Sequence, residues 1–401
     1  MRSVEEHQRV VAGLITARPA VTAELPAAEG RVLSGEVTAT VSLPVFDNSA
    51  MDGYAVRADE VASASADHPV KLPVAEDIPA GRIDVPALGP GTAHRIMTGA
   101  PVPAGATTIV PVEDTDGRTD VVSINAPSAE GKHIRHAGED VAAGTTVLRA
   151  GQVVTPAVVG LAAALGLHEL TVIPPQRVLI ISTGSELVSP GTPLRPGQIY
   201  ESNAPMLAAA VRDAGAEVVA TAAAGDDVAE LTALLDRYAA ESDLIITSGG
   251  VSAGAYEVVK DAFGRAGGQG VEFVKVAMQP GMPQGAGRVA DTPIVTLPGN
   301  PVSSLVSFEV FIRPALRSAM GLPDAQRPRR TAELAETLTA PAGKRQFRRG
   351  VFDAADGTVV SHGPPGSHHL GWLPSANCLL DVPTEVIEIP AGSVVQIWDL
   401  R

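Results

Sequence analysis

Apolar positions in the second half of the chain alternate between two periods. Short apolar runs such as "RVLIIST" (177–183) and "LII" (244–246) suit strands that are buried on both faces. Between them, 203–215 and 226–242 carry apolar residues at helical spacing. Further strands are expected in "VEFVKVAM" and "TPIVTLPGNP", and a long helix over 301–321. This alternation predicts an α/β domain over residues 176–324, with a mixed, mostly parallel sheet between two layers of helices.

The remaining chain follows other patterns. A helix is predicted over Val4–Ala17, and residues 46–134 carry short β-like runs separated by Pro and Gly, which indicates a β-rich inserted module. Residues 135–175, with a helix near 156–165, are expected to pack with the N-terminal part (1–45) as one discontinuous domain. Short strands return after residue 325, which predicts a C-terminal β domain resembling a barrel, over 325–401.

Composition narrows the function classes. The chain has 401 residues, of which 45% are hydrophobic and 19% charged, so several packed domains are expected. A net charge of −15 argues against a nucleic-acid or anionic-membrane partner. No apolar run is long enough to span a bilayer, and the acidic start does not look like a secretory signal. We expect a soluble, cytoplasmic protein in which the single Cys378 is a small buried core residue.

Small polar residues follow each strand of the predicted α/β domain. The strand in "DLIITSGGVSAGAYEVVKDAF" (243–263) ends in hydroxyls and glycines, which either form an ordinary turn or cradle an anion. In open α/β sheets, ligands bind beyond the carboxyl ends of the strands. All five strand ends together favour a phosphate-type pocket. The residues at these ends are Ser182, Thr183, Gly184, Ser185 and Glu186; Gly225, Asp226 and Asp227; Thr247, Ser248, Gly249, Gly250 and Ser252; Gln279 to Pro283; and Pro298, Gly299, Asn300 and Pro301.

The last of these loops also has turn chemistry. Asn300 is expected to cap the following helix, and Pro301 to occupy its first position, where a missing N–H costs nothing. Ser303 and Ser304 fall in the exposed first turn. Capping accounts for Asn300 and Pro301 but not for the "LPG" before them, which lets the backbone approach a ligand.

Carboxylates near three strand ends suggest a metal. Asp226 and Asp227 suit a helix start by charge alone, while Glu186 and Glu257 lie near two other strand ends. If these carboxylates converge on a bound phosphate, they provide the oxygen ligands that Mg²⁺ prefers.

A series of motifs then resembles a known family. "FDNSAMDGYAVR", "RIMTGAPVPAGATTIVPVEDT", "ISTGSEL", "GQIYESNAPML", "TSGGVSAG", "QPGMP" and "LPGNPVSSLVSFEVFIRPAL" occur in order over nearly the whole chain. They resemble the molybdopterin molybdenumtransferases of the MoeA type, to which the gephyrin E domain is related. The resemblance implies an elongated multi-domain subunit that forms a homodimer with active sites shared between subunits. It also implies Mg²⁺-assisted insertion of molybdate into adenylylated molybdopterin with release of AMP, and transient contact with the adenylyltransferase and with acceptor molybdoenzymes.

The resemblance assigns roles to particular residues. Asp52 and Thr98 match positions that act from the β-rich module at the partner subunit's cleft. Catalytic roles are also implied for Glu186, Asp227 and Lys275, and metal binding for Asp226, Asp227 and Glu257. Substrate binding is implied for Thr183, Gly184, Ser185, Ser248, Gly249, Gly250, Ser252, Pro283, Pro298, Gly299, Asn300, Pro301, Ser303, Lys344, Arg349 and Ser367.

Three positions depart from the family pattern. Gln279 and Met282 stand where many relatives have lysines, so two cations are missing beside an expected oxyanion. Glu257 stands where relatives often have Asp. The missing lysines support one alternative to the molybdenumtransferase hypothesis, a dimeric scaffold of the same fold with weakened catalysis. The domain that carries "STGSEL" and "SGGVS" also resembles molybdopterin adenylyltransferases, so the preceding adenylylation reaction is a second alternative.

Overall fold

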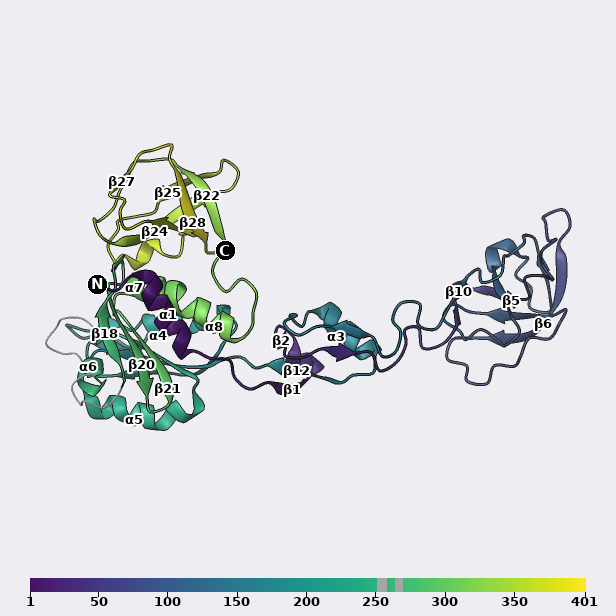
Figure 1. Ribbon diagram of the computed structural model, residues 1–401, viewed down its shortest axis with the longest axis horizontal. Helices are drawn as coiled ribbons and strands as arrows, with labels where there is room; N and C mark the ends of the chain where they lie inside the picture. The colour runs from purple at the N-terminus through teal and green to yellow at the C-terminus, as the bar shows by residue number, and fades with distance from the viewer. Residues whose placement is uncertain (251–257, 264–269) are drawn as a thin grey trace. The chain divides into compact units, whose positions relative to one another are not determined.

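The computed structural model describes residues 1–250, 258–263 and 270–401. The chain divides into two compact units (Figure 1). Unit 1 comprises Met1–Val21 and Val172–Arg401, and unit 2 comprises Thr22–Thr171. Within the described residues, no helix is both long and apolar enough to cross a membrane.

A mixed six-stranded sheet forms the centre of unit 1. The first four strands in its order, β16-β13-β17-β21-β20-β18, are parallel, and β20 runs antiparallel to both of its neighbours. This confirms the predicted mostly parallel sheet. The strands are β13 (Arg177–Thr183), β16 (Glu217–Ala224), β17 (Leu244–Ser248), β18 (Glu272–Lys275), β20 (Pro283–Val289) and β21 (Thr292–Leu297).

Helices cover both faces of this sheet, as Figure 1 shows. Strand β13 alternates between the two cores: Val178 and Ile180 belong to one, while Leu179 and Ile181 belong to the other. Every residue of β13 from Val178 onward is buried, which explains its uninterrupted apolar run. One face carries α1 (Val4–Leu14), α4 (Asn203–Asp213), α7 (Pro301–Ser307) and α8 (Arg313–Ala319), and the other carries α5 (Val228–Tyr238) and α6 (Val258–Phe263).

Two local expectations differ from the structure. The predicted long helix after Asn300 contains a π-helical turn, η3 (Phe308–Ile312), between α7 and α8. Strand β20 was not predicted, because Gly285 and Gly287 weaken a strand pattern. In the structure a Cβ on Gly287 would lie 1.9 Å from the carbonyl oxygen of Gly270, so the neighbouring backbone requires glycine there.

The N-terminal helix α1 packs within unit 1. Its buried Val4 and Val11 join the core formed by α4, α7 and α8, and Ser3 and Glu6 form a capping box at its start. This differs from the expectation that the helix groups with residues 135–175, since the apolar stripe of α1 faces the sheet layer of unit 1. The division of the chain into four domains otherwise stays a prediction.

The C-terminal part of unit 1 is a small closed barrel. Strand β24 pairs with both β25 and β26, which closes the order β24-β25-β22-β28-β26. The short β19 (Met278–Gln279) pairs with β24 and joins the "QPGMP" segment to the barrel. Cys378 is fully buried in the barrel core, and burial raises its pKa to about 12. The barrel strands are β22 (Arg329–Leu334), β24 (Arg345–Asp353), β25 (Thr358–Ser361), β26 (Cys378–Val382) and β28 (Val394–Asp399).

Unit 2 is β-rich. A five-stranded sheet of order β8-β5-β7-β6-β9 has buried apolar residues on both faces, including Tyr54 and Ile109. A three-stranded sheet of order β1-β12-β2 accompanies α2 (Leu25–Ala28) and α3 (Pro156–Ala164). The strands are β1 (Val21–Glu24), β2 (Val32–Leu33), β5 (Gly53–Val56), β6 (Val70–Ile78), β7 (Ala93–Ile96), β8 (Thr108–Pro111), β9 (Val121–Ile124) and β12 (Glu169–Ile173).

Candidate active site

A cleft of about 960 Å³ opens at the carboxyl edge of the sheet in unit 1. Its walls come from residues at the predicted strand ends, from Leu187 and residues 199–203, and from residues 344 and 365–368 of the C-terminal barrel. Fifteen of the predicted site residues line it: Thr183, Gly184, Glu186, Asp226, Ser248, Gly249, Gly250, Pro283, Pro298, Gly299, Asn300, Pro301, Ser303, Lys344 and Ser367. The parallel strands end at one edge, so loops that are far apart in sequence meet there.

Glycines are required where β17 leaves the sheet. Gly249 has φ +95°, and a Cβ there would lie 2.6 Å from the carbonyl oxygen of Thr183. Gly250 has φ +67°, and its Cβ would lie 2.8 Å from Val259. The Gly249 N–H donates to the carbonyl of Leu297 at 3.0 Å, so this N–H is used within the fold rather than offered to a ligand. These glycines therefore shape the floor of the cleft.

Two buried residues that the sequence predictions missed hold the cleft together. Glu201 accepts hydrogen bonds from the Ser182 hydroxyl at 2.8 Å and from the backbone N–H groups of Asn203 and Ala204. Its carboxylate thus joins the end of β13 to the start of α4, where negative charge suits the helix dipole. Asn203 donates from Nδ2 to the carbonyl of Gly299 at 2.7 Å. The sequence held a signal for Glu201, because an acidic residue directly before the helical pattern "NAPMLAAAVRDAG" is well placed to accept from the first N–H groups of that helix.

The loop before α7 is tied to the barrel. Helix α7 begins at Pro301, as predicted, but Asn300 makes no side-chain cap. Its amide instead donates to the Ser367 hydroxyl at 2.9 Å, so the capping prediction is wrong. Ser303 and Ser304 are both buried rather than exposed, and the Ser304 hydroxyl donates to the carbonyl of Pro298. Tertiary contacts with the barrel and the cleft floor replaced local capping.

Charge in the cleft is mostly negative. Among the described lining residues, Lys344 is the only Lys or Arg, whereas Glu186, Glu201 and Asp226 are acidic. Gln279 also lines the cleft and accepts a hydrogen bond at Oε1 from Gln346 at 2.9 Å. This hydrogen bond orients the Gln279 amide, and its NH₂ group is the end that can donate to an anion.

Several predicted residues lie elsewhere. Asp227 is the N-cap of α5, accepting from the Ala229 N–H at 2.8 Å, and Ser185 exchanges two hydrogen bonds with Asp226. The buried Arg349 donates to the carbonyls of Pro364 and His369, which supports the loop that carries Ser367. The cleft is not lined by Ser185, Asp227, Lys275 or Arg349. Ser252 and Glu257 lie outside the described residues. The roles predicted for all of them stay predictions.

The carboxylates fit a metal that binds together with a phosphate. Within the described ranges, no group of three or more His, Cys, Asp or Glu residues forms a metal cage. Mg²⁺ commonly needs only one or two protein carboxylates when substrate phosphates and waters supply the other ligands. Glu186 and Asp226 both line the cleft and meet that requirement.

Unit 2 brings Asp52 and Thr98 together. Asp52 Oδ1 accepts from the backbone N–H of Thr98 at 2.7 Å and from its hydroxyl at 2.8 Å. The backbone hydrogen bond and then the side-chain hydrogen bond from Thr98 hold the pKa of Asp52 below its usual range. The pair therefore presents an ionised carboxylate in a fixed orientation at the surface of unit 2.

The fold and the cleft define an α/β protein with a polar cleft at the carboxyl edge of its sheet and with two added β parts, and three family descriptions match these regions. Residues 2–166 match the MoeA N-terminal region (domains I and II), residues 179–318 match the description "Probable molybdopterin binding domain", and residues 331–400 match the MoeA C-terminal region (domain IV).

Full-length relatives agree with these matches. The chain is 71% identical to molybdopterin molybdenumtransferase 2 of Mycobacterium tuberculosis (strain ATCC 25618 / H37Rv), covering 100% of both proteins. It is 36% identical to molybdopterin molybdenumtransferase 1 of the same strain, over 99% of this chain and 98% of that protein. The crystal structure of a MoeA molybdopterin biosynthesis protein from Pyrococcus horikosii has 28% identity and a TM-score of 0.83, covering 100% of this chain and 99% of that one. The chain belongs to the MoeA family of molybdopterin molybdenumtransferases.

Proposed function

We propose that the protein is a transferase that inserts molybdate into adenylylated molybdopterin and releases AMP, giving the molybdenum cofactor. The observation that carries this proposal is the cleft, which residues from all five predicted strand ends line. A volume of about 960 Å³ is at the upper end of the range for small-molecule sites and suits a dinucleotide-sized substrate. The 71% identity to molybdopterin molybdenumtransferase 2 of Mycobacterium tuberculosis, over the full length of both chains, supports the same proposal.

In this proposal, neutral hydrogen-bond donors and one lysine of the cleft bind the oxyanions. The hydroxyls of Ser248 and Ser303 and the amide of Gln279 donate hydrogen bonds to the phosphates and to molybdate. Lys344 supplies the positive charge that the remainder of the lining lacks. Because Gln279 and Met282 are neutral, oxyanion binding depends on Lys344 and on neutral donors more than it would with two further lysines.

A bound Mg²⁺, held by Glu186 and Asp226, would neutralise phosphate charge and polarise the phosphoanhydride. The same two carboxylates, without a cation, would repel the phosphates. AMP release in a Mg²⁺ titration tests this: Asp226→Asn should raise the Mg²⁺ concentration needed for half-maximal release. An unchanged titration would remove Asp226 from the metal site.

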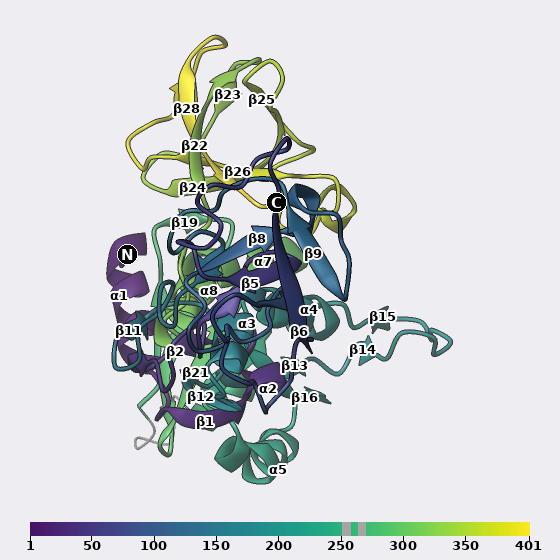
Figure 2. The same ribbon diagram turned by 90° about the vertical axis from the view of Figure 1, so that its right-hand side faces the viewer.

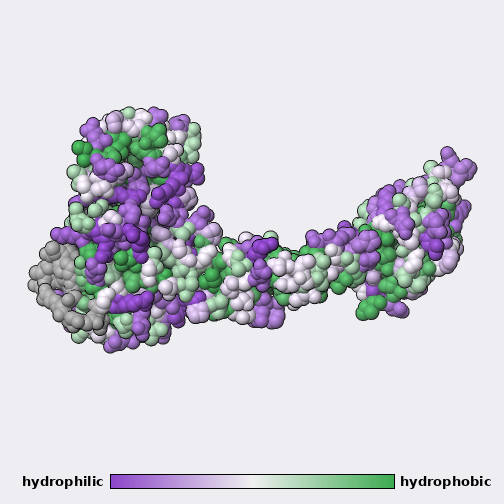
Figure 3. Space-filling model, in the orientation of Figure 1, coloured by the Kyte–Doolittle hydropathy of each residue, from purple (hydrophilic) through white to green (hydrophobic). Residues whose placement is uncertain are grey.

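We also propose a homodimer with shared active sites. Helix α3 supports it, because the segment Pro156–Leu167 has no polar side chain, yet Ala162 is the only buried residue of α3. A helix that is apolar all round is normally buried, so a second copy of the chain is expected to cover it. Hydrophobic residues are also visible at the surface of unit 2 (Figure 3).

The reaction is tested by measuring AMP release from adenylylated molybdopterin with and without molybdate. Molybdate-dependent release supports the proposal. Formation of adenylylated molybdopterin from ATP would support the adenylyltransferase alternative, and a lack of both reactions would support the scaffold.

Subunit sharing has its own test. In the proposed dimer, Asp52 of one copy completes the cleft of the other. Inactive Asp52→Ala and Glu186→Ala variants, mixed under conditions that allow subunit exchange, should regain up to about a quarter of wild-type activity, since statistical exchange leaves one intact site in half of the dimers. Absence of recovery after demonstrated exchange would place Asp52 and Glu186 in the same subunit's site.

A further inference from the structure

One wall of the cleft is apolar and open. Strands β14 (Leu187–Val188) and β15 (Ile199–Tyr200) pair with each other and carry the 189–198 loop, which extends away from β13 and β16 (Figure 2). Leu187, Ile199 and Tyr200 all line the cleft. Ile199 is 54% exposed and Tyr200 is 46% exposed, so the fold leaves much of both side chains uncovered.

The backbone holds this wall in place. The N–H of Ile199 donates to the carbonyl of Glu186 at 2.9 Å, and the N–H of Glu201 donates to the carbonyl of Val188 at 2.9 Å. Glu201 in turn anchors the start of α4, as described above. The apolar wall therefore starts next to the Gly184–Glu186 loop and ends at a buried, fully hydrogen-bonded carboxylate.

The other walls offer little aromatic surface for stacking, since His368 is the one further aromatic side chain among the described lining residues. They consist mostly of glycines, prolines, hydroxyls and carboxylates. Among the described lining residues, Tyr200 is the only Phe, Trp or Tyr. Planar heteroaromatic rings gain affinity by stacking on tyrosine and aliphatic surfaces, whatever their hydrogen-bonding pattern.

We propose that Leu187, Ile199 and Tyr200 form the subsite for a planar heteroaromatic ring, with the ring packed against Tyr200 and its phosphate directed toward the Ser248 loop. This inference rests on the proposed function, which supplies two such rings, a purine and a pterin. Through these three side chains, the cleft would bind phosphates that carry a planar ring more tightly than phosphates that lack one.

Calorimetric titration with defined probes tests the subsite. AMP and a free pterin carry a ring, and ribose 5-phosphate carries the sugar phosphate alone. Tyr200→Ala should weaken binding of AMP, of the pterin or of both about tenfold or more, which corresponds to about 1.4 kcal/mol. Ribose 5-phosphate should bind equally to the variant and the wild type. Tyr200→Phe keeps the ring and should stay within about twofold of the wild-type affinities.

A matched control lies in the same loop. Leu194 is 47% exposed but does not line the cleft, so Leu194→Ala removes a comparable exposed apolar side chain and should leave all affinities unchanged. Three results would overturn the proposal. Tyr200→Ala could lose equal affinity for AMP and for ribose 5-phosphate, it could bind both ring probes as tightly as the wild type, or the wild type could bind neither ring probe. The titration requires neither molybdate nor turnover, so it can succeed or fail independently of the AMP-release assay.

Discussion

Replacing His7 should remove a pH dependence from the stability of unit 1. His7 lies on α1, is fully buried, and contacts the ring of Phe311 edge-on at 4.7 Å between centroids. Neither ring nitrogen has a hydrogen-bond partner among the described residues. The pKa of His7 is lowered from 6.5 to about 4, mainly by burial and further by the charge of Arg2, while Glu272 opposes the shift.

The sign and size of the effect follow from proton binding. Between pH 6.5 and about 4, the unfolded chain holds a proton on His7 that the folded chain does not hold. The free energy of unfolding therefore falls as the pH drops through this window, and the loss is complete below the folded pKa. A shift from 6.5 to about 4 corresponds to about 3 kcal/mol in full, of which about 2 kcal/mol is lost by pH 5.

The assay compares the wild type with His7→Leu, which keeps an apolar side chain of similar size. Both tryptophans, Trp372 and Trp398, lie in unit 1, so their fluorescence follows its unfolding in urea at pH 7, 6 and 5. The wild type should lose about 2 kcal/mol more than the variant between pH 7 and pH 5. Arg9→Leu, at an exposed position of the same helix, serves as the control and should follow the wild type. A stability difference between His7→Leu and the wild type that stays constant over this pH range would refute the reasoning.

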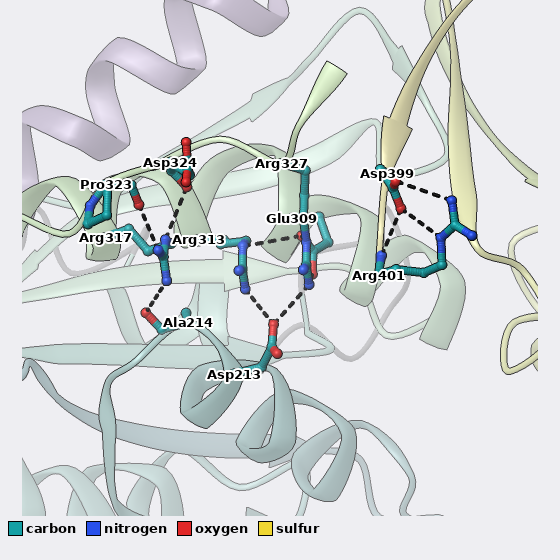
Figure 4. A network of polar contacts seen from close by, with 10 residues as sticks. All are labelled: Asp213, Ala214, Glu309, Arg313, Arg317, Pro323, Asp324, Arg327, Asp399 and Arg401. Carbon is teal, nitrogen blue, oxygen red and sulfur yellow. Dashed lines mark hydrogen bonds and ion pairs between the residues drawn. The ribbon is translucent and has the colours of Figure 1, made fainter. Parts of the chain in front are cut away.

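Three further outcomes are expected. Gly249→Ala should lower the free energy of unfolding by about 1–3 kcal/mol, because its φ is +95° and the new Cβ would lie 2.6 Å from the carbonyl oxygen of Thr183. Gly299→Ala is the control: its new Cβ would lie 3.5 Å from the nearest atom, so the variant should melt like the wild type. Asp227→Ala should cost about 1 kcal/mol as a lost N-cap, and Asp227→Ser should recover most of it in a thermal melt. Arg327→Met should lower the free energy of unfolding by about 3–5 kcal/mol, because it leaves the buried Glu309 carboxylate without its partner at 2.9 Å (Figure 4). Adding Glu309→Leu should restore much of that stability, and purely additive effects in the double variant would contradict the coupling.

Much of the fold follows from the sequence alone. The apolar run of β13 and the helical pattern that ends near Gly215 are local signals, and the structure has both elements at the predicted places. The grouping of small polar residues at one edge also follows, because parallel strands end on the same side of a sheet. For that reason, residues as distant in sequence as Thr183 and Pro298 could be expected to line one cleft.

Tertiary structure decided the remaining features, because they depend on what lies beside a residue rather than along the chain. Asn300 has the local chemistry of a helix cap, yet it donates to Ser367, which only the folded barrel brings within reach. Strand β20 contains glycines that disfavour a strand locally, but the neighbouring backbone leaves no space for a Cβ at Gly287. The carboxylate of Glu201 could have lain on the surface, and its place between β13 and α4 arises only when both elements pack. Local propensity thus determined the elements, while burial and non-local hydrogen bonds determined which of their side chains form the site.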